Sequence, residues 1–249
     1  INMKNIIIST GGSGGHVVPA TIFHEHLKDK FNIYITSDER GMQFLDKNKY
    51  NTKIINVPKI TKNIFLLPFQ IFLLLGLILK SLIFLKSKNI EVLISTGGYM
   101  SLPLCVASKI LNIKLYLFEP NMVLGRTNKL FLRSCIKIFC YSDKIKKFPN
   151  ELNNKILLIP SLLRKEFYSL KIIEDTIENI NLLIIGGSQR AKLFDEIINE
   201  LVIKISKKYK LKIFQQTSSK NFEYLKNFYL KNNIENELFD FNVDISNFM

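Results

Sequence analysis

Three glycine-rich turns follow predicted strands, and they supply the backbone from which phosphate sites are built. The first spans Thr10–His16, in which four glycines surround Ser13. Glycine lets the backbone approach a ligand closely, and the helix after such a turn offers free N–H groups and the positive end of its dipole. The stretches Gly97–Tyr99 and Gly186–Gln189 repeat the pattern after later strands. Because ligands of open α/β sheets bind at the carboxyl ends of the strands, we expect the three turns to line one cleft.

Two residues beside these turns are candidate general bases. His16 lies at a helix N-terminus, which favours the neutral imidazole that can accept a proton. Glu119 ends another predicted strand at the same expected edge, and it can orient this histidine or act as the base itself. Both residues can instead have a purely structural role. A lone histidine is more often structural than catalytic, and Glu119 can be a solvated or capping carboxylate.

The first turn differs from the common nucleotide-binding loops. Counted from Gly12, the third glycine of the dinucleotide fingerprint would fall at Val17, and the Lys-Ser/Thr pair of a P-loop is absent. Asp38 ends the second strand at a distance that suits a ribose ligand. An oxidoreductase with a nucleotide cofactor is therefore an alternative, which NAD binding would test.

Short apolar runs alternate with helical patterns, which predicts a doubly wound α/β fold. Strands are expected at 5–9, 31–36, 53–57, 91–95, 114–118, 136–141 and 155–159, with helices at 19–28 and 102–111. The pattern restarts after a polar stretch, with strands at 181–185 and 210–215 and a helix at 222–232. We predict two domains, 1–163 and 164–249. The second holds so few strand–helix units that we interpret the chain as a fragment or a truncated gene product.

Composition favours an anionic partner and a reducing compartment. The formal net charge of +14 suits nucleic acid, anionic lipid headgroups or phosphorylated substrates. Cys105, Cys135 and Cys140 have no metal-ligand spacing, and an odd, sparse cysteine count is typical of reducing conditions. The N-terminal apolar run turns at once into glycines, so we interpret it as a strand and not as a signal peptide.

The apolar stretch Ile64–Leu85 has three interpretations. It begins with sixteen residues without a charge, Ile64–Leu79, whereas a membrane span needs about 20 apolar residues. Four residues argue against a transmembrane helix: Pro68, Gln70, Gly76 and Lys80. A buried core helix is the second possibility. We favour the third, a helix lying in the membrane interface, with lysines near anionic headgroups: Lys59, Lys62, Lys80, Lys86 and Lys88.

Four motifs together resemble those of the MurG family. Residues 11–19 resemble its GGTGGHxxPA signature, and 97–103 its GGYxSxP loop. Residues 119–129 resemble its HEQNxxxGxTNK segment, and 186–189 its GGSQGA loop. The order and spacing of the motifs agree with the family over essentially the whole chain. The resemblance implies a GT-B fold of two Rossmann-like domains, the second of them incomplete here.

The resemblance also implies a reaction and a location. Members of the family transfer GlcNAc with inversion from UDP-GlcNAc to the 4-hydroxyl of MurNAc in undecaprenyl-pyrophosphoryl-MurNAc-pentapeptide (lipid I), which forms lipid II for peptidoglycan. The first domain is expected to hold lipid I and to touch an anionic membrane surface, and the second to hold UDP-GlcNAc. This implies a peripheral protein at the cytoplasmic face of the bacterial inner membrane, with no nucleic-acid partner and no cofactor. No Asp-x-Asp cluster is visible, so we expect no metal on the diphosphate.

The resemblance also implies roles for individual residues at the positions that match the family's motifs. The base is His16 or Glu119, and Tyr99 and Asn128 belong to the acceptor cleft. Donor or phosphate contacts are implied for Ser13, Gly14, Gly15, Asn121, Arg164, Ser188, Gln189 and Asn242.

The chain departs from the family pattern in several places. Ser13 replaces Thr, Arg190 replaces Gly, and Pro160-Ser161-Leu162 replaces Gly-Asn-Pro. The sequence stops before the family's Ser-Arg-x-Gly-Ala…Glu segment, so we expect little or no transfer from this polypeptide alone. Two alternatives follow: a non-catalytic binder of lipid-linked pyrophosphate, or a sibling GT-B enzyme acting on diacylglycerol.

Overall fold

The structure of the protein is a computed structural model that describes residues 3–58, 65–169 and 179–240. The chain divides into two compact units, Ile1–Lys165 and Glu166–Met249. The boundary therefore falls at 165/166, where the sequence suggested 163/164. The ligands assigned to the two domains remain predictions.

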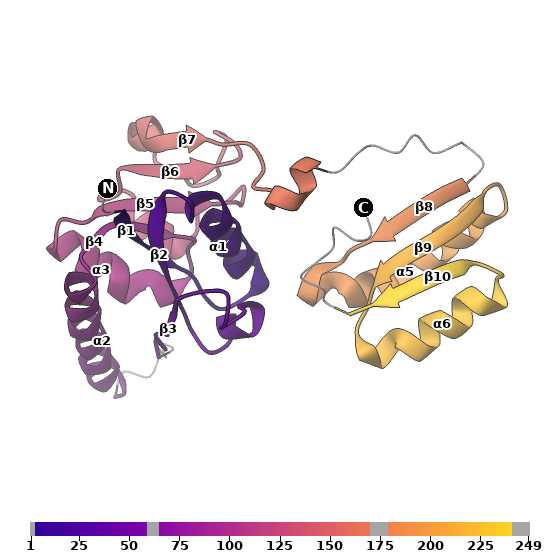
Figure 1. Ribbon diagram of the computed structural model, residues 1–249, viewed down its shortest axis with the longest axis horizontal. Coiled ribbons are helices and arrows are strands. Elements are labelled where there is room, and N and C mark those ends of the chain that lie inside the picture. The colour runs from indigo at the N-terminus through magenta and orange to yellow at the C-terminus, as the bar shows by residue number, and fades with distance from the viewer. Residues whose placement is uncertain (1–2, 59–64, 170–178, 241–249) are drawn as a thin grey trace. The chain divides into compact units, whose positions relative to one another are not determined.

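Unit 1 is built on a seven-stranded parallel sheet in the order β3-β2-β1-β4-β5-β6-β7 (Figure 1). Its strands are β1 (Lys4–Ser9), β2 (Phe31–Ser37), β3 (Thr52–Ile54), β4 (Ile90–Ser95), β5 (Lys114–Glu119), β6 (Lys137–Cys140) and β7 (Ile156–Leu158). The strand order reverses between β1 and β4, which is the switch point where sheets of this kind bind ligands. The predicted doubly wound α/β fold is confirmed.

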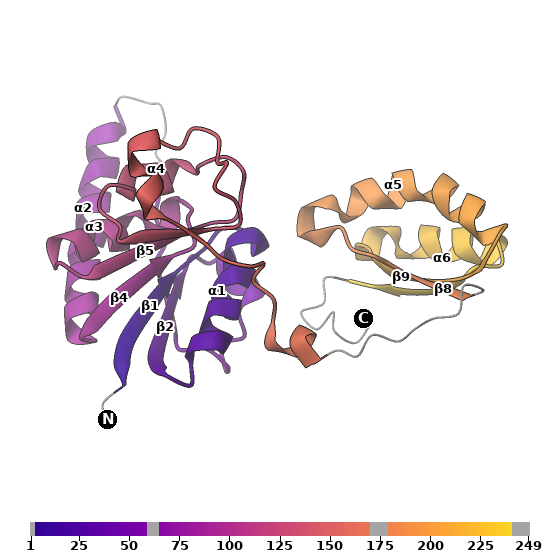
Figure 2. The same cartoon turned by 90° about the horizontal axis from the view of Figure 1, so that it is seen from above.

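Helices cover both faces of this sheet (Figure 2). Helix α1 (Gly14–Leu27) packs on one face, and α2 (Leu67–Ser87) and α3 (Leu102–Ile110) pack on the other. Strand β1 shows why its sequence is a continuous apolar run: Ile6 and Ile8 enter the core on the α1 side, whereas Ile7 enters the core beneath α2 and α3. Each such buried side chain contributes about 1.5–3 kcal/mol to folding. A short helix, α4 (Arg126–Phe131), follows β5.

Some element boundaries differ from the prediction. Helix α1 begins at Gly14, not at Pro19, because the carbonyl oxygen of Ser13 accepts hydrogen bonds from the amides of His16 and Val17 and closes a first turn within the glycine loop. The third strand ends at Ile54, three residues earlier than predicted.

Unit 2 contains a three-stranded parallel sheet in the order β10-β9-β8. Its strands are β8 (Asn179–Ile184), β9 (Lys210–Gln216) and β10 (Glu235–Phe239), and its helices are α5 (Gly187–Ser206) and α6 (Phe222–Lys231). Both helices cover the same face of the sheet (Figure 2). Between helices and sheet lies a core of Ile184, Val202, Leu211, Ile213, Leu225, Tyr229 and Ile234.

A buried polar network ties helix α5 to the end of β9. The Asp195 carboxylate accepts hydrogen bonds from the Gln215 amide at 2.8 Å, the Thr217 hydroxyl at 2.8 Å and the Asn221 amide at 2.7 Å. The Tyr229 hydroxyl donates to Gln215, and burial raises the pKa of that hydroxyl far above its usual value. The network satisfies a buried carboxylate, which would otherwise be costly.

Candidate active site

The first glycine turn lies at the carboxyl end of β1, beside the switch point. Its backbone needs glycine at Gly12, where φ is +84°. Helix α1 starts directly after Ser13, whose hydroxyl makes no capping hydrogen bond. Within the described residues, the first-turn amides of Gly14 and Gly15 have no acceptor. Free amides at a helix N-terminus form an anion site, so the turn has the geometry expected for a phosphate.

Asp38, at the end of β2, fixes the shape of this turn. Its carboxylate is 3% exposed and accepts hydrogen bonds from the amides of Gly12 at 2.7 Å and Gly41 at 2.9 Å, and from Arg40 Nε at 3.1 Å. Burial acts to raise the pKa of Asp38, but the two amides and the guanidinium outweigh it and hold the pKa below its usual value. Asp38 is therefore a structural anion that holds the loop.

Arg40 connects the first glycine turn to the second. Its Nη2 donates to the Tyr99 hydroxyl at 3.0 Å, while its Nε is held by Asp38. The side chain is about half exposed, and a Cβ added to Gly12 would lie 3.9 Å from Nη2. Arg40 thus places a fixed cation at the phosphate turn. Its role could not be predicted from the sequence, because its position depends on how β1 pairs with β2.

The orientation of His16 identifies its tautomer. Nδ1 lies 2.7 Å from the carbonyl oxygen of Thr96, at the end of β4. A carbonyl can only accept, so Nδ1 carries the proton and the lone pair of the neutral ring is on Nε2. The second turn packs closely on the ring: φ at Gly97 is +90°, and a Cβ there would lie 3.4 Å from His16 Cε1. The imidazole is therefore held with Nε2 available as a proton acceptor.

Glu119 is positioned quite differently from His16. The carboxylate is 3% exposed and accepts four hydrogen bonds. Oε1 accepts from the backbone and side-chain amides of Asn121 at 3.3 and 3.0 Å, and Oε2 accepts from the Gly125 amide at 2.7 Å and Asn128 Nδ2 at 3.0 Å. These bonds occupy both oxygens with groups of the 119–128 loop. This geometry favours an organising role for Glu119 over a role as the base.

Asn128 joins the glycine turns to this loop. Its Nδ2 donates to the Phe118 carbonyl and to Glu119, both at 3.0 Å, and would lie 3.6 Å from a Cβ at Gly97. The structure therefore brings His16, Tyr99, Glu119 and Asn128 to one edge of the sheet, around the ends of β1, β4 and β5, as the sequence led us to expect.

Arg164 lies elsewhere in unit 1. The neighbouring Leu163 carbonyl is 2.9 Å from His26 Nε2, and Lys165 pairs with Asp29 at 2.9 Å, so this segment runs past the C-terminal end of α1. A 14-residue helix is about 21 Å long, so Arg164 is well away from the glycine turn at its N-terminus. Its donor-binding role remains a prediction.

The third glycine turn belongs to unit 2. It follows β8, and α5 begins at Gly187, so the backbone of Ser188 and Gln189 forms the first turn of a helix in the same strand–turn–helix arrangement as in unit 1. Asn242 lies outside the described residues.

Helix α2 presents an apolar surface. It is long and apolar enough to cross a membrane, yet only 17% of its most apolar 18-residue window is buried. Its exposed side chains include Phe69, Phe72, Leu75, Leu79 and Ile83, and the opposite side packs on the core through Phe84 and Leu85. Lys80, Lys86 and Lys88 are exposed, whereas Lys59 and Lys62 fall outside the described residues. The buried-core interpretation of this stretch is therefore wrong.

Across the described ranges, no group of three or more His, Cys, Asp or Glu side chains is arranged to hold a metal ion.

Comparison with known proteins agrees with this geometry. The glycosyltransferase family 28 N-terminal domain matches residues 6–140, which contain the two glycine turns of unit 1, His16 and Glu119. The fold and site of unit 1 thus define a family 28 glycosyltransferase domain.

Relatives narrow the assignment. The UDP-N-acetylglucosamine--N-acetylmuramyl-(pentapeptide) pyrophosphoryl-undecaprenol N-acetylglucosamine transferase of Pelagibacter ubique (strain HTCC1062) is 57% identical over 99% of this chain and 69% of its own length. The enzyme of the same name from Prochlorococcus marinus (strain AS9601) is 32% identical over 88% of this chain and 63% of its own. The chain therefore belongs to the MurG family, and it spans roughly two thirds of these relatives.

Solved structures share the fold. Acinetobacter baumannii MurG superposes with a TM-score of 0.70 at 20% identity, covering 99% of this chain and 70% of that one. A UDP-GlcNAc 2-epimerase from Neisseria meningitidis gives a TM-score of 0.59 at 11% identity, over 98% and 74% of the two chains.

Proposed function

We propose that this protein transfers GlcNAc from UDP-GlcNAc to lipid I and so forms lipid II in peptidoglycan synthesis. The observation that supports this proposal most directly is the orientation of His16. Its Nδ1–H donates to the Thr96 carbonyl, which leaves Nε2 to act as a base beside a helix N-terminus with free amides. The names of the relatives, which are up to 57% identical to this chain, support the two substrates.

The reaction follows from these groups. His16 Nε2 takes the proton of the MurNAc 4-hydroxyl as its oxygen attacks C1 of GlcNAc. The bond from C1 to the diphosphate breaks on the opposite side, which inverts the sugar, and UDP leaves with the electron pair. The amides of Gly14 and Gly15, together with Arg40, bind the diphosphate of the acceptor. Glu119 and Asn128 hold the loop that faces His16. Ser13, Asn121, Arg164, Ser188, Gln189 and Asn242 remain proposed donor or phosphate contacts.

We further propose that the protein sits peripherally on the cytoplasmic face of the inner membrane. The exposed apolar surface of α2, flanked by Lys80, Lys86 and Lys88, suits the interface of an anionic bilayer. A transmembrane position fits poorly, because α2 packs on α3 and joins β4 within three residues. Sedimentation with phosphatidylglycerol vesicles tests this. Binding that falls with added salt supports it, and salt-independent insertion contradicts it.

Transfer is tested with the product of the whole reading frame that contains this sequence. Radiolabelled UDP-GlcNAc and lipid I should give labelled lipid II, and UDP-GlcNAc should bind in a titration. Binding of lipid I without binding of UDP-GlcNAc would indicate a non-catalytic binder instead. Transfer to diacylglycerol in place of lipid I would indicate the sibling activity.

A further inference from the structure

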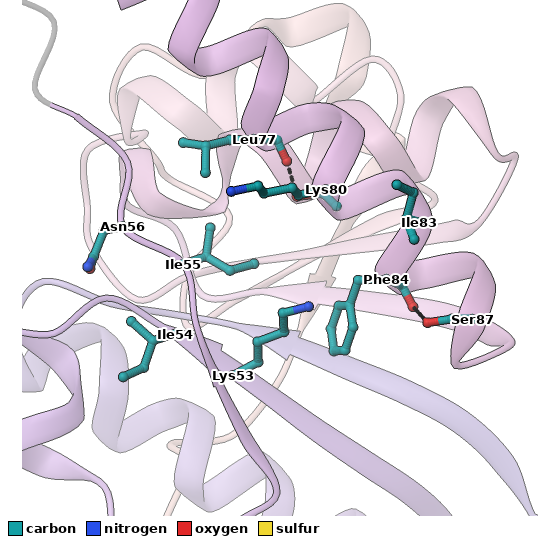
Figure 3. A pocket seen from close by; sticks show the side chains of 10 residues that line it. Lys53, Ile54, Ile55, Asn56, Leu77, Lys80, Ile83, Phe84 and Ser87 are labelled. Carbon is teal, nitrogen blue, oxygen red and sulfur yellow. Dashed lines mark hydrogen bonds between the residues drawn. The ribbon is translucent and has the colours of Figure 1, made fainter.

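A groove runs between α2 and the segment that includes and follows β3. One part, of about 480 Å³, is lined by Lys53–Asn56 on one side and by Leu77, Lys80, Ile83 and Phe84 on the other (Figure 3). A second part, of about 430 Å³, continues over Val57 and Pro58 to Phe72, Leu73 and Gly76. The two parts share Asn56, Leu77 and Lys80, so they form one continuous channel along the helix.

The walls of this groove suit an apolar chain that carries an anionic group. Aliphatic and aromatic side chains form most of its surface, and at Gly76 a Cβ would meet nothing within 4 Å, so the helix leaves room there. Two cations lie along it. The Lys53 ammonium is 3.9 Å from the centre of the Phe84 ring, toward which its side chain reaches in Figure 3. In the described part of the chain, neither Lys53 nor Lys80 pairs with a carboxylate.

The middle of the groove, where its two parts meet at Asn56, is linked to the glycine turn through the end of β2. Ile54 pairs with Ser37 at the end of β2, and two residues further on the Asn56 side chain exchanges hydrogen bonds of 3.0 and 2.9 Å with Glu39. Arg40, the next residue, is the cation at the phosphate turn. From there the groove follows α2, whose outer side is the exposed apolar surface.

We propose that this groove holds the prenyl chain of the lipid-linked acceptor, between its diphosphate at the glycine turn and the bilayer. The proposal rests on the proposed function. A chain crossing from that turn to the membrane through water would leave every methylene hydrated, which is unfavourable, whereas the groove covers it. A membrane phospholipid matches the same walls, but nothing in its chemistry requires it to reach the part of the groove at Asn56, which bonds to Glu39 next to Arg40, toward the expected diphosphate.

The test uses soluble acceptors, MurNAc-pentapeptide diphosphates that carry either a methyl or a farnesyl group. Calorimetry on the wild-type chain should show the farnesyl acceptor binding at least about tenfold more tightly, as expected from the burial of roughly two methylene groups. Gly76→Leu should fill the groove and reduce this ratio to near one without weakening the methyl acceptor. Leucine is also a better helix former than glycine, so the variant should fold, which circular dichroism would check.

Leu79→Phe is the matched control, since Leu79 is 60% exposed on the same helix and outside the groove. It should keep the wild-type ratio. The proposal is overturned if Gly76→Leu keeps the full ratio, if Leu79→Phe lowers it equally, or if the wild-type ratio is near one. It is also overturned if Gly76→Leu weakens binding to phosphatidylglycerol vesicles but leaves the prenyl ratio intact. If the methyl acceptor fails to bind wild-type protein, the proposed function itself is wrong.

Discussion

Removing the Asp38 carboxylate should destabilise unit 1 through the glycine turn. Asp38→Ala leaves two backbone amides, the buried one of Gly41 and the partly buried one of Gly12, without their charged acceptor. Hydrogen bonds to charged groups are worth about 1.5–3 kcal/mol each, so the expected loss is about 3–6 kcal/mol. The ion pair with half-exposed Arg40 adds little. A loss of this size is a large part of the total stability of a domain.

Urea unfolding followed by circular dichroism measures this loss, and hydrogen exchange at the Gly12 and Gly41 amides locates it. The pKa of Asp38 is lowered by folding, so its contribution is complete above the unfolded value of about 3.9 and disappears as pH falls through the lower folded value. The difference between wild type and variant should therefore shrink below about pH 4. Asp29→Ala, at an exposed aspartate, is the control and should leave the unfolding free energy essentially unchanged. A loss below about 1 kcal/mol for Asp38→Ala, or one that stays constant down to pH 2, would refute the reasoning.

Three further predictions concern the rest of unit 1. Glu119→Gln replaces one acceptor oxygen by an NH₂ group that faces donors on either side, Asn121 or the pair Gly125 and Asn128, so the melting temperature should fall and transfer should be lost; unchanged melting would contradict the organising role. Gly97→Ala should cost about 1–3 kcal/mol in urea unfolding, because φ is +90° there, and a neutral result would show that the loop relaxes. Burial raises the pKa of the Cys105 and Cys140 thiols to about 12, so iodoacetamide at pH 8 should label them only after denaturation, as mass spectrometry can check; rapid native labelling would argue against this burial.

The sequence predicted those parts of the site that depend on local signals. Strand-end glycines followed by a helical pattern place His16 and Gly97 at one edge of a parallel sheet, and the structure brings them into contact. Helix α1 was nevertheless predicted to start too late. Pro19 suggested a first helical position, whereas the Ser13 carbonyl already closes a turn five residues earlier.

Features that depend on strand pairing could not be predicted in the same way. The hydrogen bond that Asp38 accepts from the Gly12 amide arises only when β1 and β2 lie side by side. Nothing in the local sequence around Arg40 indicates that it reaches Tyr99. Strand β10 was missed because Glu235–Phe239 contains two glutamates and an asparagine and has no apolar run. Its pairing with β9 provides the stabilisation that the local sequence lacks.

The proposed mechanism depends most directly on His16, the side chain at the glycine turns that takes the proton of the acceptor. His16→Ala, made in the product of the whole reading frame, should lower the rate of GlcNAc transfer to lipid I by about 10²–10⁴-fold. Its unfolding transition and its affinity for UDP-GlcNAc should stay close to those of the wild type. Transfer at the wild-type rate by the folded variant would show that Nε2 takes no proton from the acceptor and would contradict the proposed mechanism.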